Sequence, residues 1–356
     1  MLNSIGKTIV FNFSGSLTSL TLATKKDMQH KAGFVNIVGN PNVGKSTLMN
    51  QLVGERISIA TFKAQTTRHR IMGIVNSDDC QIVFSDTPGV LKPNYKMQEF
   101  MLQFSESALA DADVLLYVTD VVENPEKNID FLAKVREMTI PVIVLINKID
   151  QLAMAPAAAC AGDKRAKGAR QQNAAEANGS AHVGIMQGQK LLGDIVEKWH
   201  SLLPNAEILP ISATNKFGVD MLMKRVKELL PESPAYFDKD QLTDKPARFF
   251  VSEIIREKIL RYYDKEIPYS VEVVVERFKE EHQRIHINAV IYVERDSQKG
   301  IVIGHQGMAL KKVSTEARKS LERFFGKSIF LEIFVKVDKD WRNSERELGN
   351  FGYNPQ

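Results

Sequence analysis

Short, nearly continuous apolar runs alternate with helical periodicity over the first two-thirds of the chain. Runs of this kind are typical of strands that are buried on both faces. They occupy positions 33–38, 81–85, 114–119, 141–146 and 208–211, and helical stretches such as 41–53 separate them. The alternation predicts an α/β domain with a mostly parallel sheet and helices on both of its faces.

The last third of the chain has a different order of elements. Helical periodicity at 248–263 and 307–325 combines with strand-like runs at 269–278, 284–294 and 328–337. This α-β-β-α-β order predicts a second, α+β domain. Proline residues punctuate the segment between the two domains, so we interpret 231–246 as a linker.

Three segments do not follow these patterns. Positions 153–184 are rich in Ala, Gly, Gln and Asn without an apolar period, which predicts a disordered insertion, and helical periodicity returns over 185–203. We interpret 1–30, which has no acidic residue before Asp27, as a disordered leader or a start placed too early; a targeting peptide is the alternative. Positions 344–356 are expected to form a tail.

The composition limits the class of protein. A length of 356 residues allows two hydrophobic cores, which we assign to 31–230 and 247–343. Cys80 and Cys160 lack metal-ligand spacing, and this usage suits a reducing cytosol. The net charge of +4 is small, so nucleic-acid binding requires a local patch. No run approaches the roughly 20 apolar residues of a membrane span.

A glycine-rich loop joins the first predicted strand to the first predicted helix. It matches G-x-x-x-x-G-K-[ST] and comprises Gly39, Asn40, Pro41, Asn42, Val43, Gly44, Lys45 and Ser46, followed by Thr47. In such a loop backbone amides surround phosphates, the lysine neutralises the β- and γ-phosphates, and the serine hydroxyl binds Mg²⁺. A plain turn between strand and helix is the competing interpretation.

Three further motifs follow later strands in the order of a guanine-nucleotide site. They are Asp86, Thr87, Pro88 and Gly89; then Asn147, Lys148, Ile149 and Asp150; and finally Ser212 and Ala213. Asp86 would lie near the metal, and Ser212 and Ala213 beside the base. Asp150 can accept two hydrogen bonds from N1 and N2 of guanine, a donor pair that adenine lacks. The order of the four motifs favours a nucleotide site over unrelated turns.

The polar segment 64–70 lies between the glycine-rich loop and Asp86, and we predict that it is the first switch. Thr67, with Thr66 as the alternative, would join Ser46 and Asp86 at the metal and respond to loss of the γ-phosphate. The predicted catalytic residues are Asn42, Lys45, Thr67, Asp86 and Gly89.

The apolar run 301–303 leads into a G-x-x-G loop formed by Gly304, His305, Gln306 and Gly307. Such loops approach an RNA backbone closely, and the N-terminus of the following helix offers partial positive charge to phosphate. Seven Lys or Arg against two Glu within 299–327 supply the local positive patch. A lone G-x-x-G usually marks only a turn, so the interpretation depends on the α-β-β-α-β order, which is typical of the KH type II fold.

The segments GNPNVGKSTLMN, KAQTTRHRIMGI, SDTPGVLKP and NKID resemble the Era family of bacterial GTPases, and the resemblance extends over about 31–341. It implies a P-loop G domain that binds GTP and GDP and slowly hydrolyses GTP with Mg²⁺. It also implies a KH domain that binds single-stranded 16S rRNA near its 3′ end, in assembly and maturation of the 30S subunit. By the same resemblance His305 and Gln306 would lie against the RNA backbone, and Lys311 and Lys312 would steer the RNA. The implied protein is a cytoplasmic monomer with peripheral contact to the inner membrane.

Two positions near the phosphates bear on hydrolysis. Val90 follows Gly89 where many GTPases carry a glutamine that orients the attacking water, and a valine side chain cannot do this. In related GTPases an asparagine equivalent to Asn42 helps to hold K⁺. We hypothesise the same here, against the alternative that Asn42 only shapes the loop.

Other functions are compatible with parts of the sequence. The main rival is an RNA-binding protein in which nucleotide serves only for stability. A tandem G-domain protein is disfavoured because the sequence has one P-loop and one NKxD motif. Nothing in the sequence resembles the folate-binding domain of a tRNA-modifying GTPase.

Overall fold

The computed structural model describes residues 30–152 and 174–354. Six strands form the first sheet in the order β2-β3-β1-β4-β5-β6, and β2 alone runs antiparallel to its neighbour. The strands are β1 (Lys31–Gly39), β2 (Ile71–Asn76), β3 (Cys80–Asp86), β4 (Val114–Asp120), β5 (Val142–Asn147) and β6 (Glu207–Pro210). The sheet is mostly parallel as predicted, with β2 as an additional strand at its edge.

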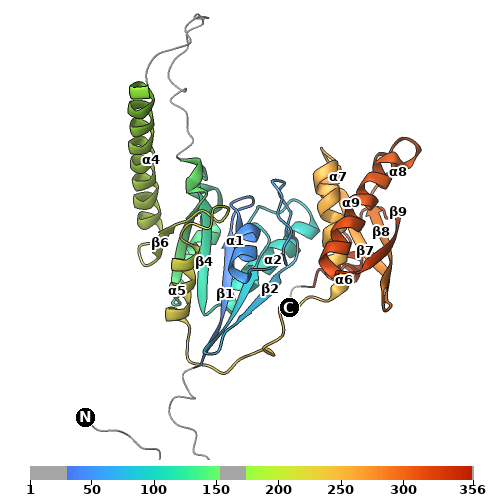
Figure 1. The fold of residues 1–356 in the computed structure, drawn as a ribbon, viewed down its shortest axis with the longest axis horizontal. Helices are drawn as coiled ribbons and strands as arrows, with labels where there is room; N and C mark the ends of the chain where they lie inside the picture. Colours follow the sequence, from blue (N-terminus) through green and yellow to red (C-terminus); the bar gives the residue numbers. More distant parts are fainter. Residues whose placement is uncertain (1–29, 153–173, 355–356) are drawn as a thin grey trace, which may run out of the picture.

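Helices cover both faces of this sheet, as the alternation predicted (Figure 1). α1 (Lys45–Val53) and α5 (Val219–Leu229) pack on one face through residues such as Leu48 and Leu222. α2 (Lys96–Ala110), α3 (Ile129–Arg136) and α4 (Ala174–Leu202) pack on the other, where the Trp199 and Tyr117 ring centroids lie 5.3 Å apart. Among the described helices, none combines the length and the apolar character that crossing a membrane requires.

The segment expected to be a disordered insertion differs from the prediction over the part that the structure describes. Its first part, 153–173, lies outside the described residues. Helix α4 begins at Ala174, within the supposed insertion and ahead of the periodicity that returns at 185. Alanine has the highest intrinsic helix propensity, and elongation of an existing helix is far easier than nucleation. An Ala-rich segment can therefore extend a packed helix without an apolar face of its own.

A smaller sheet of β7 (Val271–Glu280), β8 (Arg284–Val293) and β9 (Ser328–Val337) forms the second domain. β7 and β8 are antiparallel, whereas β8 and β9 are parallel. α6 (Ala247–Tyr262), α8 (Asp296–Ile303) and α9 (Met308–Phe325) share one hydrophobic core with this sheet. In Figure 1, α6 lies between the first domain and α9.

The order of elements in this domain needs two corrections. Positions 301–303 end helix α8, which the predicted α-β-β-α-β order omitted; the Gln298 side chain accepts hydrogen bonds from the Glu294 and Arg295 amides at the start of this helix. Ile301, Val302 and Ile303 are β-branched, a residue type that is enriched in strands, but here Val302 packs into the core from a helix. The short helix α7 (Ile267–Ser270) likewise occupies the predicted beginning of β7.

The connecting segments are held against the domains. Residues of the predicted linker bond to β2: the Ile74 amide donates to the Leu242 carbonyl at 2.8 Å, and the Met72 amide donates to Asp244 at 2.8 Å. The expected tail contains α10 (Glu345–Asn350). It also contributes to a fourth apolar cluster that joins the first domain to the C-terminal end, formed by Met97, Met101, Trp341, Leu348 and Tyr353.

Candidate functional site

The glycine-rich loop connects β1 to α1 at the carboxyl edge of the parallel strands. Gly44 has a φ of 100°, and a Cβ at this position would lie 2.3 Å from Nδ2 of Asn147 on β5. A Cβ on Gly89 would lie 2.7 Å from Pro41. These two glycines therefore permit both the left-handed turn and the close packing of the loop against two neighbouring motifs.

Lys45 lies buried beneath the loop. Its Nζ donates to the carbonyl oxygens of Gly39, at 3.0 Å, and Asn40, at 2.8 Å. Burial lowers the pKa of Lys45 to about 8, while the negative charges of Asp86 and Glu123 oppose this shift. The lysine is placed where a loop-bound phosphate would receive its positive charge.

Three oxygen atoms converge beside the loop. The Ser46 hydroxyl lies 2.7 Å from Oδ2 of Asp86 and 2.8 Å from the Thr67 hydroxyl, which lies 3.3 Å from the same carboxylate oxygen. Oδ1 of Asp86 is buried without a hydrogen-bond partner among the described residues, and burial raises the pKa of this carboxyl. Hard oxygen ligands and an unpartnered buried carboxylate oxygen fit a Mg²⁺ site.

The geometry favours Thr67 over Thr66 at this position. Oγ1 of Thr66 is instead within 2.7 Å of the Thr61 hydroxyl and donates to the Lys63 carbonyl at 2.6 Å. Thr66 lies in a bend that directly follows a turn at 64–65. Thr67 therefore faces Asp86 while Thr66 supports its own loop.

The base-directed residues surround the other end of the loop. Asn147 links the loop to the last motif, since its Nδ2 donates to the Val43 carbonyl at 2.8 Å and its Oδ1 accepts from the Ala213 amide at 3.0 Å. The Ser212 hydroxyl donates to Oδ1 of Asp150 at 2.5 Å. This bond fixes the orientation of the carboxylate that we predict to select guanine.

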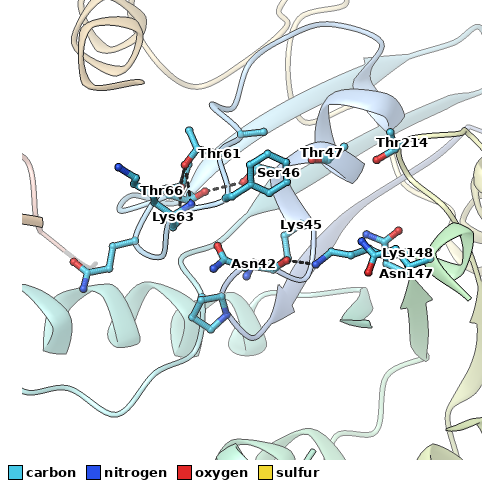
Figure 2. Close-up of a pocket in the computed structure, with 18 of the residues that line it drawn as sticks. Asn42, Lys45, Ser46, Thr47, Thr61, Lys63, Thr66, Asn147, Lys148 and Thr214 are labelled. Atoms are coloured by element: carbon cyan, nitrogen blue, oxygen red, sulfur yellow. Dashed lines mark hydrogen bonds between the residues drawn. The ribbon is translucent and has the colours of Figure 1, made fainter. Parts of the chain in front are cut away.

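Residues of the loop, the predicted switch and the Asn147–Asp150 motif line one cavity of about 250 Å³, and Asp86, Ser212 and Ala213 support it from outside its lining (Figure 2). In the close-up, Thr61 and Thr66 lie on one side of the loop, and Asn147 and Lys148 lie on the other. Lys148 donates to the Asn42 carbonyl at 2.6 Å and lies 2.7 Å from Asp120. Lining residues that the sequence did not indicate are Ala60, Thr61, Phe62, Lys63, Gln151 and Thr214.

The remaining residues of the second motif, Thr87 and Pro88, make hydrogen bonds within the domain. The Thr87 hydroxyl donates to the Ile37 carbonyl at 2.7 Å, and the Pro88 carbonyl accepts from Ser105 at 2.8 Å. Val90 is 4% exposed and packs among apolar residues beneath the sheet, while its amide donates to the Gly39 carbonyl at 3.1 Å. Its side chain is thus turned into the core.

Sequence reasoning missed Glu123. Its carboxylate accepts from the Thr119 hydroxyl at 2.6 Å and from the side-chain amide of Asn40 in the loop. Burial raises the pKa of Glu123, and the bonds from Thr119 and Asn40 oppose that rise. The position of Thr119 and Asp120 at the carboxyl end of β4 was a signal that could have indicated this support for the loop.

The G-x-x-G loop is an exposed turn between α8 and α9. Gly304 has a φ of 72° and a Cβ there would lie 2.6 Å from Cβ of Ala309, so glycine is required for this close approach. His305 and Gln306 are exposed, and Gln306 has a φ of 49°. Lys311 and Lys312 are also exposed, and Nζ of Lys312 lies 4.3 Å from the centroid of the Tyr262 ring.

The predicted switch is bonded directly to the second domain. Arg68 is 1% exposed; its guanidinium donates to the Val271 carbonyl at 2.7 Å, the Pro268 carbonyl at 3.1 Å and Glu272 at 2.9 Å. From α6, Arg256 donates to the carbonyl oxygens of Gln65, at 3.3 Å, and Thr66. The backbone on either side of Thr67 is therefore anchored to another domain.

The C-terminal segment completes this junction. The Tyr353 hydroxyl donates to Glu272 at 2.8 Å, and its ring centroid lies 4.4 Å from that of His69. Burial lowers the pKa of His69 to about 3 and raises the pKa of Tyr353 well above its usual range. Both side chains are thus neutral, and they pack as parts of the domain contact.

Comparison with known proteins agrees with this architecture. Residues 34–148 match the family model of a 50S ribosome-binding GTPase, and residues 266–342 match the KH domain. The structure of Era in complex with MgGDPNP and nucleotides 1506–1542 of 16S ribosomal RNA is 34% identical, with a TM-score of 0.78; the match covers 91% of this chain and 99% of that one.

A second similar structure is that of a single-substitution variant of Aquifex aeolicus Era bound to GDP·AlF₄⁻. It is also 34% identical, covers the same shares of the two chains, 91% and 99%, and has a TM-score of 0.77. Both domains and their order along the chain are included in these matches. The chain therefore belongs to the Era family of GTPases.

Proposed function

We propose that this GTPase binds GTP and GDP in the 250 Å³ cavity, hydrolyses GTP slowly with Mg²⁺, and binds 16S rRNA through its KH domain during assembly and maturation of the 30S subunit. One observation carries the proposal: phosphate-, metal- and base-directed groups surround one cavity in a chain that also presents a G-x-x-G loop. The solved Era complex with MgGDPNP and a 16S rRNA fragment supports both kinds of ligand. The G domain would span 31–230 and the KH domain 247–343.

The loop residues and Lys45 are proposed to hold the phosphates, with Ser46, Thr67 and Asp86 as the residues that hold Mg²⁺. When bound, the ion would neutralise charge on the β- and γ-phosphates. The unpartnered Oδ1 of Asp86 supports this assignment, because a buried carboxylate oxygen without a partner is unfavourable unless a cation satisfies it.

The residues around the far end of the cavity are proposed to hold the base. Asp150 accepts from N1 and N2 of guanine, and Ser212 keeps its carboxylate in position at 2.5 Å. The backbone at Ala213 and the side chains of Asn147 and Lys148 complete the site. This assignment is supported by the location of Asn147, Lys148 and Asp150, which line the same cavity. Hydrogen bonds to Val43 and Ala213 hold the Asn147 side chain in position.

Hydrolysis would proceed without a water-orienting glutamine, because the position after Gly89 is Val90 and its side chain is buried. We propose that Asn42 helps to hold K⁺, which would add positive charge beside the phosphates. Asn42 is exposed at the rim of the cavity, with a φ of 66°, and its side chain is thus accessible to a cation. Equal hydrolysis rates in Na⁺ and K⁺, unchanged by Asn42→Ala, would refute the K⁺ assignment.

The nucleotide is proposed to change how the two domains are arranged. Loss of the γ-phosphate would release Thr67, whose neighbours Arg68 and Thr66 contact the KH domain. A shift of this segment cannot leave those buried bonds unchanged, because Arg68 donates to three acceptors in the other domain. The switch contacts thus give the nucleotide state a direct connection to the RNA-binding domain.

The rival function is RNA binding with nucleotide present only for stability. Single-turnover GTP hydrolysis, measured with and without the 1506–1542 fragment of 16S rRNA, separates the two. We expect slow turnover that the RNA alters, together with weak or absent binding of ATP. Guanosine and adenosine nucleotides that bind equally, or GTP that is bound but never cleaved, would contradict the proposed function.

The cellular setting is part of the same proposal. The protein would act as a monomer in the cytoplasm with peripheral contact to the inner membrane, as membership of the family implies. Short basic segments give this membrane contact modest physical support. Co-flotation of the purified protein with anionic vesicles at low and high salt tests it.

A further inference from the structure

A buried carboxylate at the junction of the domains is surrounded by an excess of positive charge. The side chain of Glu257 on α6 is 0% exposed. Arg56, from the loop after α1 of the G domain, donates to its Oε1. Lys258 Nζ lies 3.0 Å from Oε2, and Arg261 Nη2 lies 2.6 Å from Oε1. One negative charge therefore holds three positive charges in place.

Two of these cations remain accessible to solvent. The side chains of Arg56 and Arg261 are 55% and 52% exposed, although each contacts the buried carboxylate. A guanidinium has five N–H donors, so a contact with one carboxylate oxygen leaves others for a ligand. Its planar, forked geometry suits phosphate, and fixing it in advance lowers the entropic cost of binding.

The cations continue towards the G-x-x-G loop. Arg261 is one turn beyond Glu257, about 6 Å along the helix. Next to it, Tyr262 packs under Nζ of Lys312 on α9, and the Tyr263 hydroxyl donates to the Val302 carbonyl of α8 at 2.6 Å. α6 therefore connects the helices that flank the G-x-x-G loop with the G domain, as its position in Figure 1 also shows.

Carboxylates on the neighbouring elements do not cancel this charge. Asp264 lies 2.9 Å from Lys63, and Glu316 on α9 lies 2.9 Å from Lys319. The charge of Lys258 also acts on Glu316, but neither carboxylate is paired with Arg56 or Arg261. The surface therefore fits a polyanion with regularly spaced charges, and the G-x-x-G loop at one end favours an RNA backbone over an acidic protein.

We propose that RNA held at the G-x-x-G loop continues along α6 onto the G domain, where Arg261 and Arg56 contact backbone phosphates. The inference rests on the proposed RNA-binding function and extends it to a second surface. It gives RNA a contact with the loop that leads from Arg56 into the predicted switch. Bound RNA thereby holds the two domains together across Glu257.

The test compares two RNA probes on the full chain. The long probe is the 1506–1542 fragment of 16S rRNA, and the short probe is about six nucleotides from its 3′ end, slightly more than the four that a G-x-x-G loop clamps. We expect Arg56→Gln with Arg261→Gln to weaken binding of the long probe about tenfold and of the short probe less than twofold. The slope of log affinity against log salt should become shallower by about 0.7 for each phosphate that the variant no longer neutralises.

Three further variants separate the possible outcomes. Arg225→Gln removes one positive charge, half the change in the double variant, from an exposed ion-pair group on α5 and should change neither affinity. Glu257→Gln keeps all three cations, so it should preserve or strengthen binding of the long probe. If Glu257→Gln instead weakens binding as the arginine changes do, the effect comes from a disturbed junction and the inference is wrong.

The G-x-x-G loop distinguishes this inference from the function on which it rests. His305→Asp with Gln306→Asp should weaken both probes. Suppose the loop variant weakens both probes, but the arginine changes alter neither the ratio of the two affinities nor the salt dependence. The extended surface is then refuted, while RNA binding at the G-x-x-G loop stands. Unchanged affinity of both probes for the loop variant would refute the proposed RNA-binding function itself.

Discussion

Individual polar side chains in the nucleotide site take their positions from the ends of parallel strands. Asp86 ends β3, Asn147 ends β5, and Ser212 follows β6, so three distant motifs meet at one edge of the sheet. Residue type then decides the chemistry. The predicted guanine selectivity rests on Asp150, whose carboxylate accepts hydrogen bonds only and is oriented by Ser212.

Asp150→Asn should transfer preference from GTP to XTP. The asparagine side chain would present a donor to the N2–H donor of guanine, whereas xanthine carries an acceptor at that position. We expect GTP affinity to fall by at least about a hundredfold, consistent with leaving a polar group unpaired in a site built for it. Fluorescence titration with both nucleotides measures the change.

Ser212→Ala serves as the matched control for that substitution. It frees the carboxylate without changing its acceptor character, so affinity for GTP should decrease while the preference for GTP over XTP is kept. An Asp150→Asn variant that still prefers GTP would show that another residue selects the base.

Helices and strands at the junction have roles that their own patterns do not reveal. α6 contributes Val251, Ile255 and Ile259 to the KH core. The Arg256 side chain of the same helix donates a hydrogen bond to the Thr66 carbonyl in the predicted switch. β7 likewise supplies Glu272, which accepts from both Arg68 and Tyr353. Buried ion pairs of this kind are very sensitive to loss of one partner, since the remaining charge stays without solvent.

Arg68→Met should destabilise the protein by about 3–5 kcal/mol, because Glu272 is left as a buried charge facing only the Tyr353 hydroxyl. Combining it with Glu272→Gln should restore much of that loss, since the uncompensated charge is removed. Urea unfolding of both single variants and the double variant measures the coupling energy. Additive losses in this cycle would show that the pair does not act as a unit.

The whole molecule consists of two cores joined by a continuous contact. The linker is hydrogen-bonded to β2, and Arg68 of the predicted switch bonds to Glu272 of the KH domain. In the C-terminal segment, Trp341 and Tyr353 pack with Met97 and Met101 of α2. The chain beyond β9 thus closes the contact between the domains. An arrangement of this kind allows events at the phosphates to reach the RNA-binding surface.

Ending the chain after Asp340 should loosen this contact without unfolding the KH sheet. The truncation removes Trp341, Leu348 and Tyr353 from the shared apolar cluster, and loss of even one large buried aromatic side chain costs about 3–5 kcal/mol. We expect two separated thermal transitions and a larger radius of gyration by small-angle X-ray scattering. A chain ended after Tyr353 is the control, and one unchanged transition in both would contradict the role of this segment.

The sequence by itself determined the features that depend on local pattern. Buried strands, the phosphate loop, the guanine motifs and the G-x-x-G loop are encoded by residues that are contiguous in the chain, so hydrophobic period and motif order predicted them. Local pattern was insufficient where packing or the elongation of an existing helix decides the structure. The run 301–303 is helical because Val302 reaches the core, and α4 begins early because it extends from a packed helix.

Only the tertiary structure decided how the domains contact each other. Arg68 and Glu272 are about 200 positions apart, as are Arg56 and Glu257, and no periodicity links such residues. The same holds for Glu123, which supports the loop from the end of β4, and for the choice of Thr67 over Thr66. These contacts form because folding brings distant side chains together where burial makes each charge require a partner.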